Sequence, residues 1–240
     1  MKKKQKSFTK ELRRFILGKF KILTYLIRGN DVVTDRRREM LALAMGFVWQ
    51  NKMKGDYLEF GVYQGATFCK AYYLAQRCIR DSMKFYAFDS FKGLPKNQGL
   101  DDDKESVFSE GEYSCSKDSF IKNLSARGIK QDKVQITEGW FKDSLNEQRK
   151  KELPISKASI LWVDCDLYES TVPVLDFITG YVQNGTILIF DDWFCFRGDP
   201  DKGQQRAFRE WLSKNTSITA SEFHKYSWHG NSFILHKDNS

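Results

Sequence analysis

The chain has 240 residues, 41% of them hydrophobic and 29% charged, which is the composition of a globular protein long enough to bury a core as one domain. Its net charge of +8 comes from one end, because residues 1–30 carry ten basic residues and one acidic residue while the rest of the chain sums to −1. A neutral body argues against a nucleic-acid footprint spread over the fold, and no stretch reaches the roughly 18 uninterrupted apolar residues of a membrane-spanning helix.

Residues 1–34 are predicted to form a basic amphipathic arm. Lysines and arginines alternate there with apolar residues at nearly helical spacing, at positions 8, 12, 15, 16, 20, 23, 26 and 27. Two interpretations stay open. The arm is either a helix that packs on its own domain or on a sister subunit of a homo-oligomer, or a cationic helix that makes peripheral contact with an anionic membrane through residues 1–30. Nucleic-acid binding by the arm is the least favoured.

From Asp35 onward, predicted helices and strands alternate along the chain. Asp35 can cap a helix over residues 36–52, whose buried face would hold Met40, Leu43, Ala44, Phe47 and Val48. Strands are expected at 57–61, 84–89, 133–137, 159–164 and 186–190, and helices at 66–80, 119–127, 142–152, 171–181 and 203–214. This alternation predicts an α/β fold with a mostly parallel sheet covered on both faces.

Two segments interrupt the alternation. Residues 92–118, which contain three consecutive aspartates and three glycines, are predicted to be a long mobile loop. Residues 223–228 and 232–236 are expected to pair as an antiparallel hairpin that turns at 229–231 and lies at the edge of the sheet.

The five cysteines are expected to be reduced thiols. No two of them form a CxxC pair, and Cys69, Cys165 and Cys195 lie inside apolar runs, so neither zinc ligands nor disulfides are predicted. Reduced thiols without a membrane span predict a cytoplasmic protein, which would lie at the inner face of the membrane if its arm binds lipid.

Acidic residues end the predicted strands. They are Glu59, Asp89, Glu138, the pair Asp164 and Asp166, and the pair Asp191 and Asp192. Ligands of an open parallel sheet bind beyond the carboxyl ends of its strands. If the fourth and fifth strands are neighbours, about 4.8 Å apart, Asp164, Asp191 and Asp192 would converge on a hard ion such as Mg²⁺, because crowded carboxylates repel one another unless a cation holds them. The alternative is that some of these aspartates cap the following helices or turns.

The first strand runs into a glycine turn, Glu59-Phe-Gly61-Val-Tyr-Gln-Gly65-Ala-Thr67, which lacks the GxGxxG spacing of a dinucleotide site. A carboxylate inside this turn opposes a pyrophosphate and suits a cation or a hydroxyl. A tight strand-to-helix turn without any ligand explains the pattern nearly as well. Asp89, at the end of the second strand, is placed to accept hydrogen bonds from a ribose.

Five segments, in this order, resemble the macrocin O-methyltransferase family: YLEFGVYQGAT, FYAFDSFKGLP, GWFKDSL, WVDCDLYESTVPVLDF and GTILIFDDW. The resemblance covers roughly residues 35–212. It implies a Rossmann-like, seven-stranded class I methyltransferase fold for residues 35–240. It also implies S-adenosyl-L-methionine and Mg²⁺ as cofactors, and an acceptor hydroxyl on a sugar or glycoconjugate such as an antibiotic, polysaccharide or glycolipid precursor.

The resemblance also implies roles for individual residues. Glu59, Gly61, Tyr63, Gly65 and Thr67 would surround the methionine part of the cofactor, Asp89 and Ser90 its ribose, and Gly139 and Trp140 its adenine. Asp164, Asp191 and Asp192 match the metal ligands, and Asp166 matches the general base of some members. Other relatives are thought to use a histidine from the middle of the chain, but the first one here is His224. The base is therefore expected to be Asp166, and the three histidines, His224, His229 and His236, are expected to be structural or exposed.

The predicted function is O-methylation. A bound Mg²⁺ is expected to lower the pKa of the acceptor hydroxyl, with Asp164 as a ligand, so that Asp166 can remove the proton. Residues that select the acceptor are expected in loop 92–118 and at 194–202. Two alternatives stay open: a Mg²⁺-dependent glycosyltransferase that uses Asp164-Cys165-Asp166 as a DxD motif, and a membrane-docked binding module without turnover.

Overall fold

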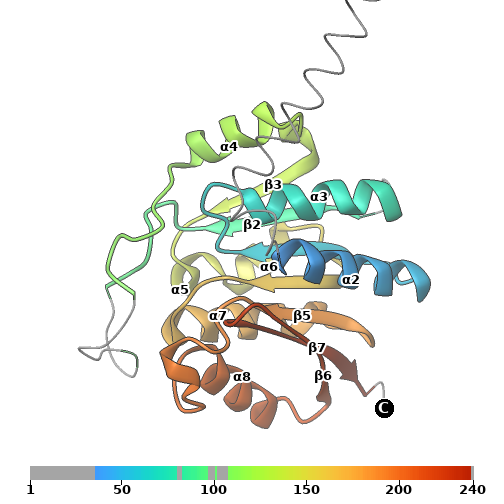
Figure 1. Cartoon of the computed structure of the whole chain (residues 1–240), viewed down its shortest axis with the longest axis vertical. Helices are drawn as coiled ribbons and strands as arrows, with labels where there is room; N and C mark the ends of the chain where they lie inside the picture. Colours follow the sequence, from blue (N-terminus) through green and yellow to red (C-terminus); the bar gives the residue numbers. More distant parts are fainter. Residues whose placement is uncertain (1–35, 80–82, 97–100, 102–107, 239–240) are drawn as a thin grey trace, which may run out of the picture. The chain divides into compact units, whose positions relative to one another are not determined.

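Seven strands form one sheet in the order β3-β2-β1-β4-β5-β7-β6 (Figure 1). The computed structural model describes residues 36–79, 83–96, 101 and 108–238. Its strands are β1 (Asp56–Phe60), β2 (Phe85–Asp89), β3 (Val134–Glu138), β4 (Ala158–Val163), β5 (Thr186–Phe190), β6 (Ile218–Tyr226) and β7 (Gly230–Lys237). The helices are α2 (Arg36–Gln50), α3 (Ala66–Cys78), α4 (Lys117–Ala126), α5 (Phe141–Ser144), α6 (Glu147–Glu152), α7 (Tyr168–Ile178) and α8 (Gly203–Lys214), with short 3-10 turns η3 (Gln131–Lys133), η4 (Thr179–Tyr181) and η5 (Phe196–Gly198).

Strands β1 to β5 pair in parallel, β7 runs antiparallel to β5, and β6 pairs with β7 at the edge. Strand order reverses between β1 and β4, where the chain moves from one half of the sheet to the other. Such a switch point leaves a crevice beyond the carboxyl ends of the strands. The predicted α/β class, the parallel sheet and the antiparallel edge hairpin are all confirmed.

Helices cover both faces of the sheet. Side chains of α2, α3 and α4 pack on one face, where Tyr57, Ile160 and Trp162 lie, and side chains of α7 and α8 pack on the other, with Leu58 and Phe60 (Figure 1). Every residue of β1, β4 and β5 is buried, as expected for central parallel strands. A charged side chain on these strands therefore lies in the apolar interior, whether or not it has a hydrogen-bond or ionic partner there.

Apart from shifts in the bounds of several elements, such as β6, which begins at Ile218 rather than at 223, the structure differs from the predicted elements at three places. Helix α2 buries Leu41 and Met45, whereas Leu43 is 45% exposed, because apolar residues on several sides of this helix leave its periodicity ambiguous. The helix predicted over 142–152 is two helices, since Asn146 is extended and its side chain accepts a hydrogen bond from Arg149 N at 2.9 Å to start α6. The terminal hairpin turns at residues 227–229 rather than 229–231.

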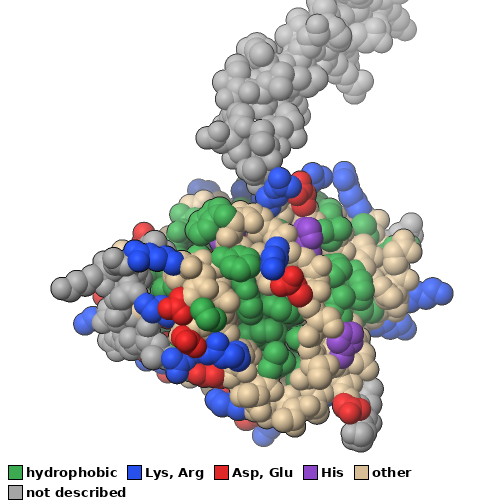
Figure 2. Space-filling view, turned by 60° about the horizontal axis from the view of Figure 1, so that its bottom comes forward, with side chains coloured by type: hydrophobic (Ala, Val, Ile, Leu, Met, Phe, Trp, Pro, Cys, Tyr) green, Lys and Arg blue, Asp and Glu red, His purple; other side chains and the backbone are tan. Residues whose placement is uncertain are grey.

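The arm predicted at residues 1–34 and the cap predicted at Asp35 lie outside the described residues. Within the described part of the chain, no helix has the length and the apolar character needed to cross a membrane. Figure 2 shows one face of the described unit, on which acidic and basic side chains are interspersed around exposed apolar ones. This mixture agrees with the net charge of −1 that the chain carries after residue 30.

Loop 92–118 is anchored at several described residues, which include Leu94 and Phe108, packed near Leu167 and Cys195, and Asp101. The buried carboxylate of Asp101 accepts hydrogen bonds from Tyr168 N at 2.6 Å and from Gly203 N at 3.0 Å. These two amides belong to the first residues of α7 and α8, where unpaired N–H groups attract an anion. The loop is therefore attached to the two helices that follow β4 and β5.

Candidate active site

A cavity of about 1020 Å³ opens at the carboxyl ends of the strands. Most of the predicted site residues line it: Glu59, Gly61, Tyr63, Thr67, Asp89, Ser90, Trp140, Asp164, Asp166 and Asp192. Gly65, Gly139 and Asp191 are not among the residues that line the cavity. Each of them is a sequence neighbour of a residue that does line it. Glu138 ends β3 as predicted but pairs with Lys117 at 3.3 Å, and both are partly exposed.

Gly61 sets the distance between β1 and β4 at the mouth of the cavity. Its φ of +86° is in the left-handed region, and a Cβ at this position would lie 1.7 Å from the carbonyl oxygen of Asp164. The backbone is fixed on both sides, because Gly61 N donates to Phe88 O at 2.9 Å and Asp164 N donates to Phe60 O at 2.8 Å. Only glycine allows this approach.

Asp89 holds the glycine turn in place. One of its carboxylate oxygens accepts from the backbone amides of Val62 at 2.8 Å and Tyr63 at 3.1 Å, and the other accepts from Phe91 N at 2.7 Å. Burial raises the pKa of Asp89, and these backbone hydrogen bonds, together with one from Ser90, oppose that rise. The Ser90 hydroxyl donates to Gly93 O and accepts from Lys92 N, both at 3.0 Å, and so stabilises the start of the following loop.

Glu59 is a buried carboxyl group on the central strand. It accepts a hydrogen bond from the Tyr57 hydroxyl, two residues earlier on the same face of β1. Burial raises its pKa to about 8, an effect that the Tyr57 hydrogen bond and Arg37 reduce and that Asp191 and Asp89 reinforce. The carboxyl group is thus largely neutral at pH 7 unless a cation enters the site.

Asp164, Asp191 and Asp192 come together as predicted, because β4 and β5 are paired neighbours. One carboxylate oxygen from each lies within 4.8 Å of the others. Burial, and then repulsion from the other two carboxylates, raises the pKa of Asp164 well above its ordinary range. Among the described residues no hydrogen bond to the Asp164 side chain is found. An all-oxygen donor set with an unsatisfied, repelled carboxylate fits a hard divalent cation such as Mg²⁺.

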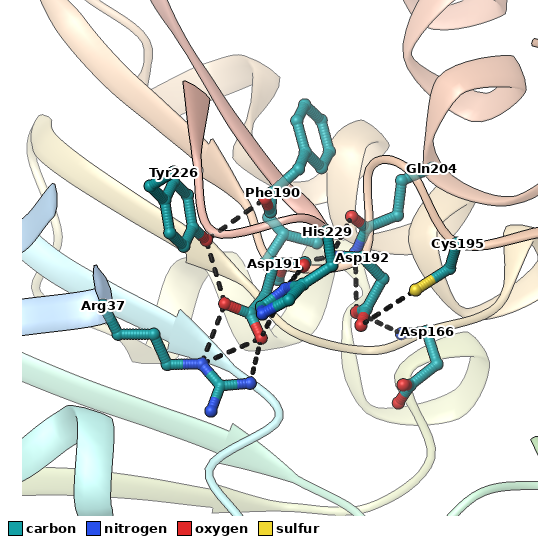
Figure 3. Close-up of polar contacts among 10 residues, drawn as sticks. Arg37, Asp166, Phe190, Asp191, Asp192, Cys195, Gln204, Tyr226 and His229 are labelled. Atoms are coloured by element: carbon teal, nitrogen blue, oxygen red, sulfur yellow. Dashed lines mark hydrogen bonds and ion pairs between the residues drawn. The ribbon is translucent and has the colours of Figure 1, made fainter. Parts of the chain in front are cut away.

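Asp191 already has a cationic partner, Arg37 of helix α2. Arg37 Nε donates to both carboxylate oxygens at 2.9 and 3.0 Å, and its Nη2 donates to Oδ2 (Figure 3). The Tyr226 hydroxyl donates to Oδ1 at 2.9 Å from the other side. These contacts use the lone pairs of Asp191, so a metal ion that coordinates this carboxylate has to displace Arg37 from at least one of them.

Asp192 is held by Gln204 and by the backbone of Asp166. Gln204, buried on α8, accepts from Asp192 N at 2.9 Å and donates to Asp192 Oδ2 at 3.3 Å and to Val163 O at 3.2 Å, so that its amide bridges the ends of β4 and β5 (Figure 3). Asp166 N donates to the same Oδ2 at 3.1 Å. Asp166 is in the left-handed region, with a φ of +61°, and this hydrogen bond stabilises that conformation.

The Asp166 carboxylate is buried beside the three others. Burial first, and then repulsion from Asp164 and Asp191, raises its pKa well above the ordinary range of an aspartate. Because a weaker acid has a stronger conjugate base, this position suits proton removal once a cation balances the neighbouring charges. The alternative prediction was that some of these aspartates cap the following helices or turns. Asp192 accepts a backbone N–H, but from Asp166, which lies earlier in the chain.

Four residues at the site were not predicted from the sequence: Arg37, Gln204, Tyr226 and His229. Arg37 lies 154 residues from its partner Asp191, so no local spacing indicates the pair. His229 was expected to be structural or exposed; its side chain is 15% exposed, and its Nδ1 contacts the Asp191 carbonyl oxygen. The sequence did contain a signal for Tyr226 and His229, because a hairpin at the edge of the sheet brings its turn toward the carboxyl end of β5.

A sequence model of the family described as Macrocin-O-methyltransferase (TylF) matches residues 26–219. The chain belongs to this family. The resemblance of the five sequence segments is thereby confirmed. The matched range contains the acidic ends of strands β1 to β5. It ends before the turn of the β6–β7 hairpin at 227–229.

Two relatives of this member of the macrocin O-methyltransferase family are similar to it over part of their length. One is the 8-demethyl-8-(2,3-dimethoxy-alpha-L-rhamnosyl)-tetracenomycin-C 4'-O-methyltransferase of Streptomyces olivaceus, 28% identical over 172 residues. Another is the mycinamicin III 3''-O-methyltransferase of Micromonospora griseorubida, 28% identical over 177 residues. Each match covers 69% of this chain but only 63% and 65% of the relatives, so the chain spans less than two thirds of their length.

Solved structures agree on the fold. The O-methyltransferase NovP superposes with a TM-score of 0.72 at 22% identity, covering 86% of this chain and 82% of that one. CalS11, the calicheamicin methyltransferase, gives a TM-score of 0.67 at 19% identity, covering 82% and 77%. The predicted seven-stranded class I methyltransferase fold is confirmed.

The buried Glu59 predicts a pH-dependent stability. Its pKa is about 8 in the folded protein and about 4.3 in the unfolded chain, so between these values the folded state binds the extra proton and stability falls as pH rises. Glu59→Gln removes this titration. In urea unfolding with EDTA, we expect the variant to gain on wild type by a few kcal/mol between pH 5 and pH 9. A constant difference across this range would contradict the assignment.

The Arg37–Asp191 pair predicts a stability change that Mg²⁺ reverses. Arg37→Ala leaves a buried carboxylate without its cation, so we expect a loss of about 1–3 kcal/mol in urea unfolding with EDTA. Because the lone pairs of Asp191 are then free, Mg²⁺ should stabilise the variant more than wild type. Arg209→Ala, which removes an exposed pair with Asp201 (2.6 Å), is the control and should change neither quantity appreciably. Equal stabilisation of Arg37→Ala and wild type by Mg²⁺ would disprove the competition.

Proposed function

We propose that the chain is an S-adenosyl-L-methionine-dependent O-methyltransferase that acts, with a divalent cation, on a hydroxyl group of a sugar or glycoconjugate. The observation that carries this proposal is the convergence of Asp164, Asp191 and Asp192 within 4.8 Å in a family of O-methyltransferases. The two relatives described above are named as O-methyltransferases of a rhamnosyl-tetracenomycin and of mycinamicin III, which supports a glycosylated acceptor.

The cavity is divided between two sets of residues in a way that suits two ligands. On the β1–β2 side, the glycine turn and Asp89 offer backbone groups and a carboxylate to a nucleoside. On the β4–β5 side, the acidic residues offer oxygen ligands to a cation and a base to an acceptor. We place the methionine part of the cofactor near Glu59, Gly61, Tyr63, Gly65 and Thr67, its ribose near Asp89 and Ser90, and its adenine near Gly139 and Trp140.

Asp166 is the proposed general base. A divalent ion held by Asp164, Asp191 and Asp192 would supply charge that lowers the pKa of an acceptor hydroxyl. Asp166 takes the hydroxyl proton, the oxygen forms a bond to the methyl carbon, and the carbon–sulfur bond breaks to leave S-adenosylhomocysteine. Gln204 and the Asp166 amide keep Asp192 in place while this occurs.

We further propose that residues 1–34 form an arm distinct from the catalytic domain at 35–240. Its net charge of +9 over residues 1–30 and its apolar spacing support contact with an anionic membrane surface or with a sister subunit. A cytoplasmic enzyme with a membrane-linked glycan acceptor would be consistent with the first of these.

Ligand choice tests the proposed cofactor. Isothermal titration calorimetry should give saturable binding of S-adenosylhomocysteine and no comparable heat from nucleoside diphosphate sugars. The reason is that the Glu59 carboxyl group inside the glycine turn opposes a pyrophosphate, whereas the Asp89 carboxylate is placed beside the cavity to accept from a ribose. Binding of nucleoside diphosphate sugars without S-adenosylhomocysteine binding would instead support a glycosyltransferase.

Substitution of the acidic residues tests the chemistry. With labelled S-adenosyl-L-methionine, Mg²⁺ and a panel of rhamnosides as acceptors, Asp166→Asn should lower kcat by roughly 10²–10⁴-fold while leaving S-adenosylhomocysteine affinity unchanged. Asp164→Asn, and EDTA on wild type, should abolish turnover. Asp176→Asn, on the exposed side of α7, is the matched control and should retain full activity. Full turnover by Asp166→Asn would remove the base assignment, and full turnover in EDTA would remove the metal.

A further inference from the structure

The turn of the β6–β7 hairpin, residues 227–229, lies at the cavity beside the acidic residues. Because β7 is antiparallel to β5, with Asn231 paired to Phe190, the start of β7 is next to the carboxyl end of β5. Trp228 and His229 of this turn line the same cavity as Asp164 and Asp192. The turn is beyond the range that the family model matches, and neither residue has a role in the function proposed above.

Several contacts fix the turn. The Tyr226 hydroxyl donates to Asp191 Oδ1 at 2.9 Å, and Phe194 N donates to His229 O at 2.8 Å. A Cβ at Gly230 would lie 2.3 Å from the Tyr226 ring, so only glycine lets this ring pack against the start of β7. A rigid turn presents its side chains to a ligand at little entropic cost.

His229 offers one hydrogen-bond acceptor to the cavity. Its Nδ1 contacts the Asp191 carbonyl oxygen, which only accepts, so Nδ1 carries the proton of the neutral ring (Figure 3). Nε2 then has the free lone pair. His229 lines the cavity together with Asp164, Asp166 and Asp192, so Nε2 is available to a hydroxyl group of an acceptor bound there.

Trp228 offers an apolar surface next to that acceptor. Its side chain is 72% exposed although it lines the cavity, and its ring is nearly perpendicular to the His229 ring, at 73° with centroids 5.1 Å apart. A large aromatic side chain that is exposed inside a cavity gains little from folding, and it is characteristic of a ligand-binding position.

We propose that Trp228 and His229 bind the sugar ring of the acceptor. The Trp228 ring packs against the face of the pyranose where C–H bonds predominate, and His229 Nε2 accepts a hydrogen bond from a hydroxyl near the one that is methylated. A pyranose combines an apolar face with a hydroxyl edge, which is the combination that these two side chains complement. This assignment rests on the proposed O-methyltransferase function and adds a third segment to the acceptor-selecting segments predicted at 92–118 and 194–202.

Saturation-transfer difference NMR tests the assignment without turnover. The probe is methyl α-L-rhamnopyranoside, with Mg²⁺ and S-adenosylhomocysteine present. Wild type should transfer saturation to the ring protons of the sugar, and Trp228→Ala should weaken its affinity by about three- to tenfold. Trp49→Ala removes another exposed tryptophan, 55% exposed on α2 and outside the cavity, and should bind the sugar as wild type does.

Two substitutions separate the roles of the His229 nitrogens. His229→Asn keeps an N–H close to the position of Nδ1 and removes Nε2, whereas His229→Ala removes both. If Nε2 contacts the sugar, both variants should lose sugar affinity to a similar extent. If His229 only supports Asp191, His229→Asn should bind the sugar normally, and this outcome would overturn its contact with the acceptor.

The outcome for the proposed sugar-binding platform, which consists of Trp228 and His229, can be distinguished from the outcome for the proposed methyltransferase function. Calorimetry with S-adenosylhomocysteine on the same samples reports the cofactor site, which lies on the β1–β2 side of the cavity and should be unchanged in all four variants. Normal cofactor binding with equal sugar signals from wild type and Trp228→Ala, or with no sugar signal from wild type, would overturn the platform alone. Loss of cofactor binding in wild type would overturn the methyltransferase proposal itself.

Discussion

Asp164, Asp166, Asp191 and Asp192 follow two hydrogen-bonded strands, and their mutual repulsion has to be balanced before the sheet can hold them at one edge. The protein balances part of it with groups of its own. Arg37 neutralises Asp191, and Gln204 and a backbone amide satisfy Asp192. Asp164 has no such partner among the described residues, and burial, followed by repulsion from Asp191 and Asp192, raises its pKa. A divalent cation held by these carboxylates would balance the repulsion that the side chains leave, as the proposed function requires.

The two halves of the cavity are built by different means. On the β1–β2 side the shape comes from backbone, because the glycine turn is fixed by Asp89 through two amide hydrogen bonds. On the β4–β5 side it comes from charged side chains and the residues that orient them. Backbone recognition suits a cofactor that stays the same from one enzyme to the next, and side-chain recognition suits an acceptor that changes.

Much of the fold could be predicted from the sequence, since central strands and amphipathic helices have strong local patterns. Strand 186–190 and helix 203–214 were predicted with the bounds that the structure shows. The convergence of Asp164, Asp191 and Asp192 followed from one assumption, that β4 and β5 are neighbours. Arg37, Gln204 and Tyr226 could not be predicted, because their roles depend on contacts between segments far apart in the chain. The break at Asn146 was missed because capping by its side chain competes with a continuous helical pattern.

The close approach at Gly61 has an implication for how such a catalyst diversifies. Because Gly61 has no Cβ, β1 can contact the start of the loop after β4. The main chain therefore sets the spacing between the proposed methyl donor and its acceptor. Mutations in the outer segments can then alter which molecule is modified without disturbing the alignment of the reacting atoms. A side chain at position 61 would instead clash with the carbonyl oxygen of Asp164 and disturb the spacing of both strands.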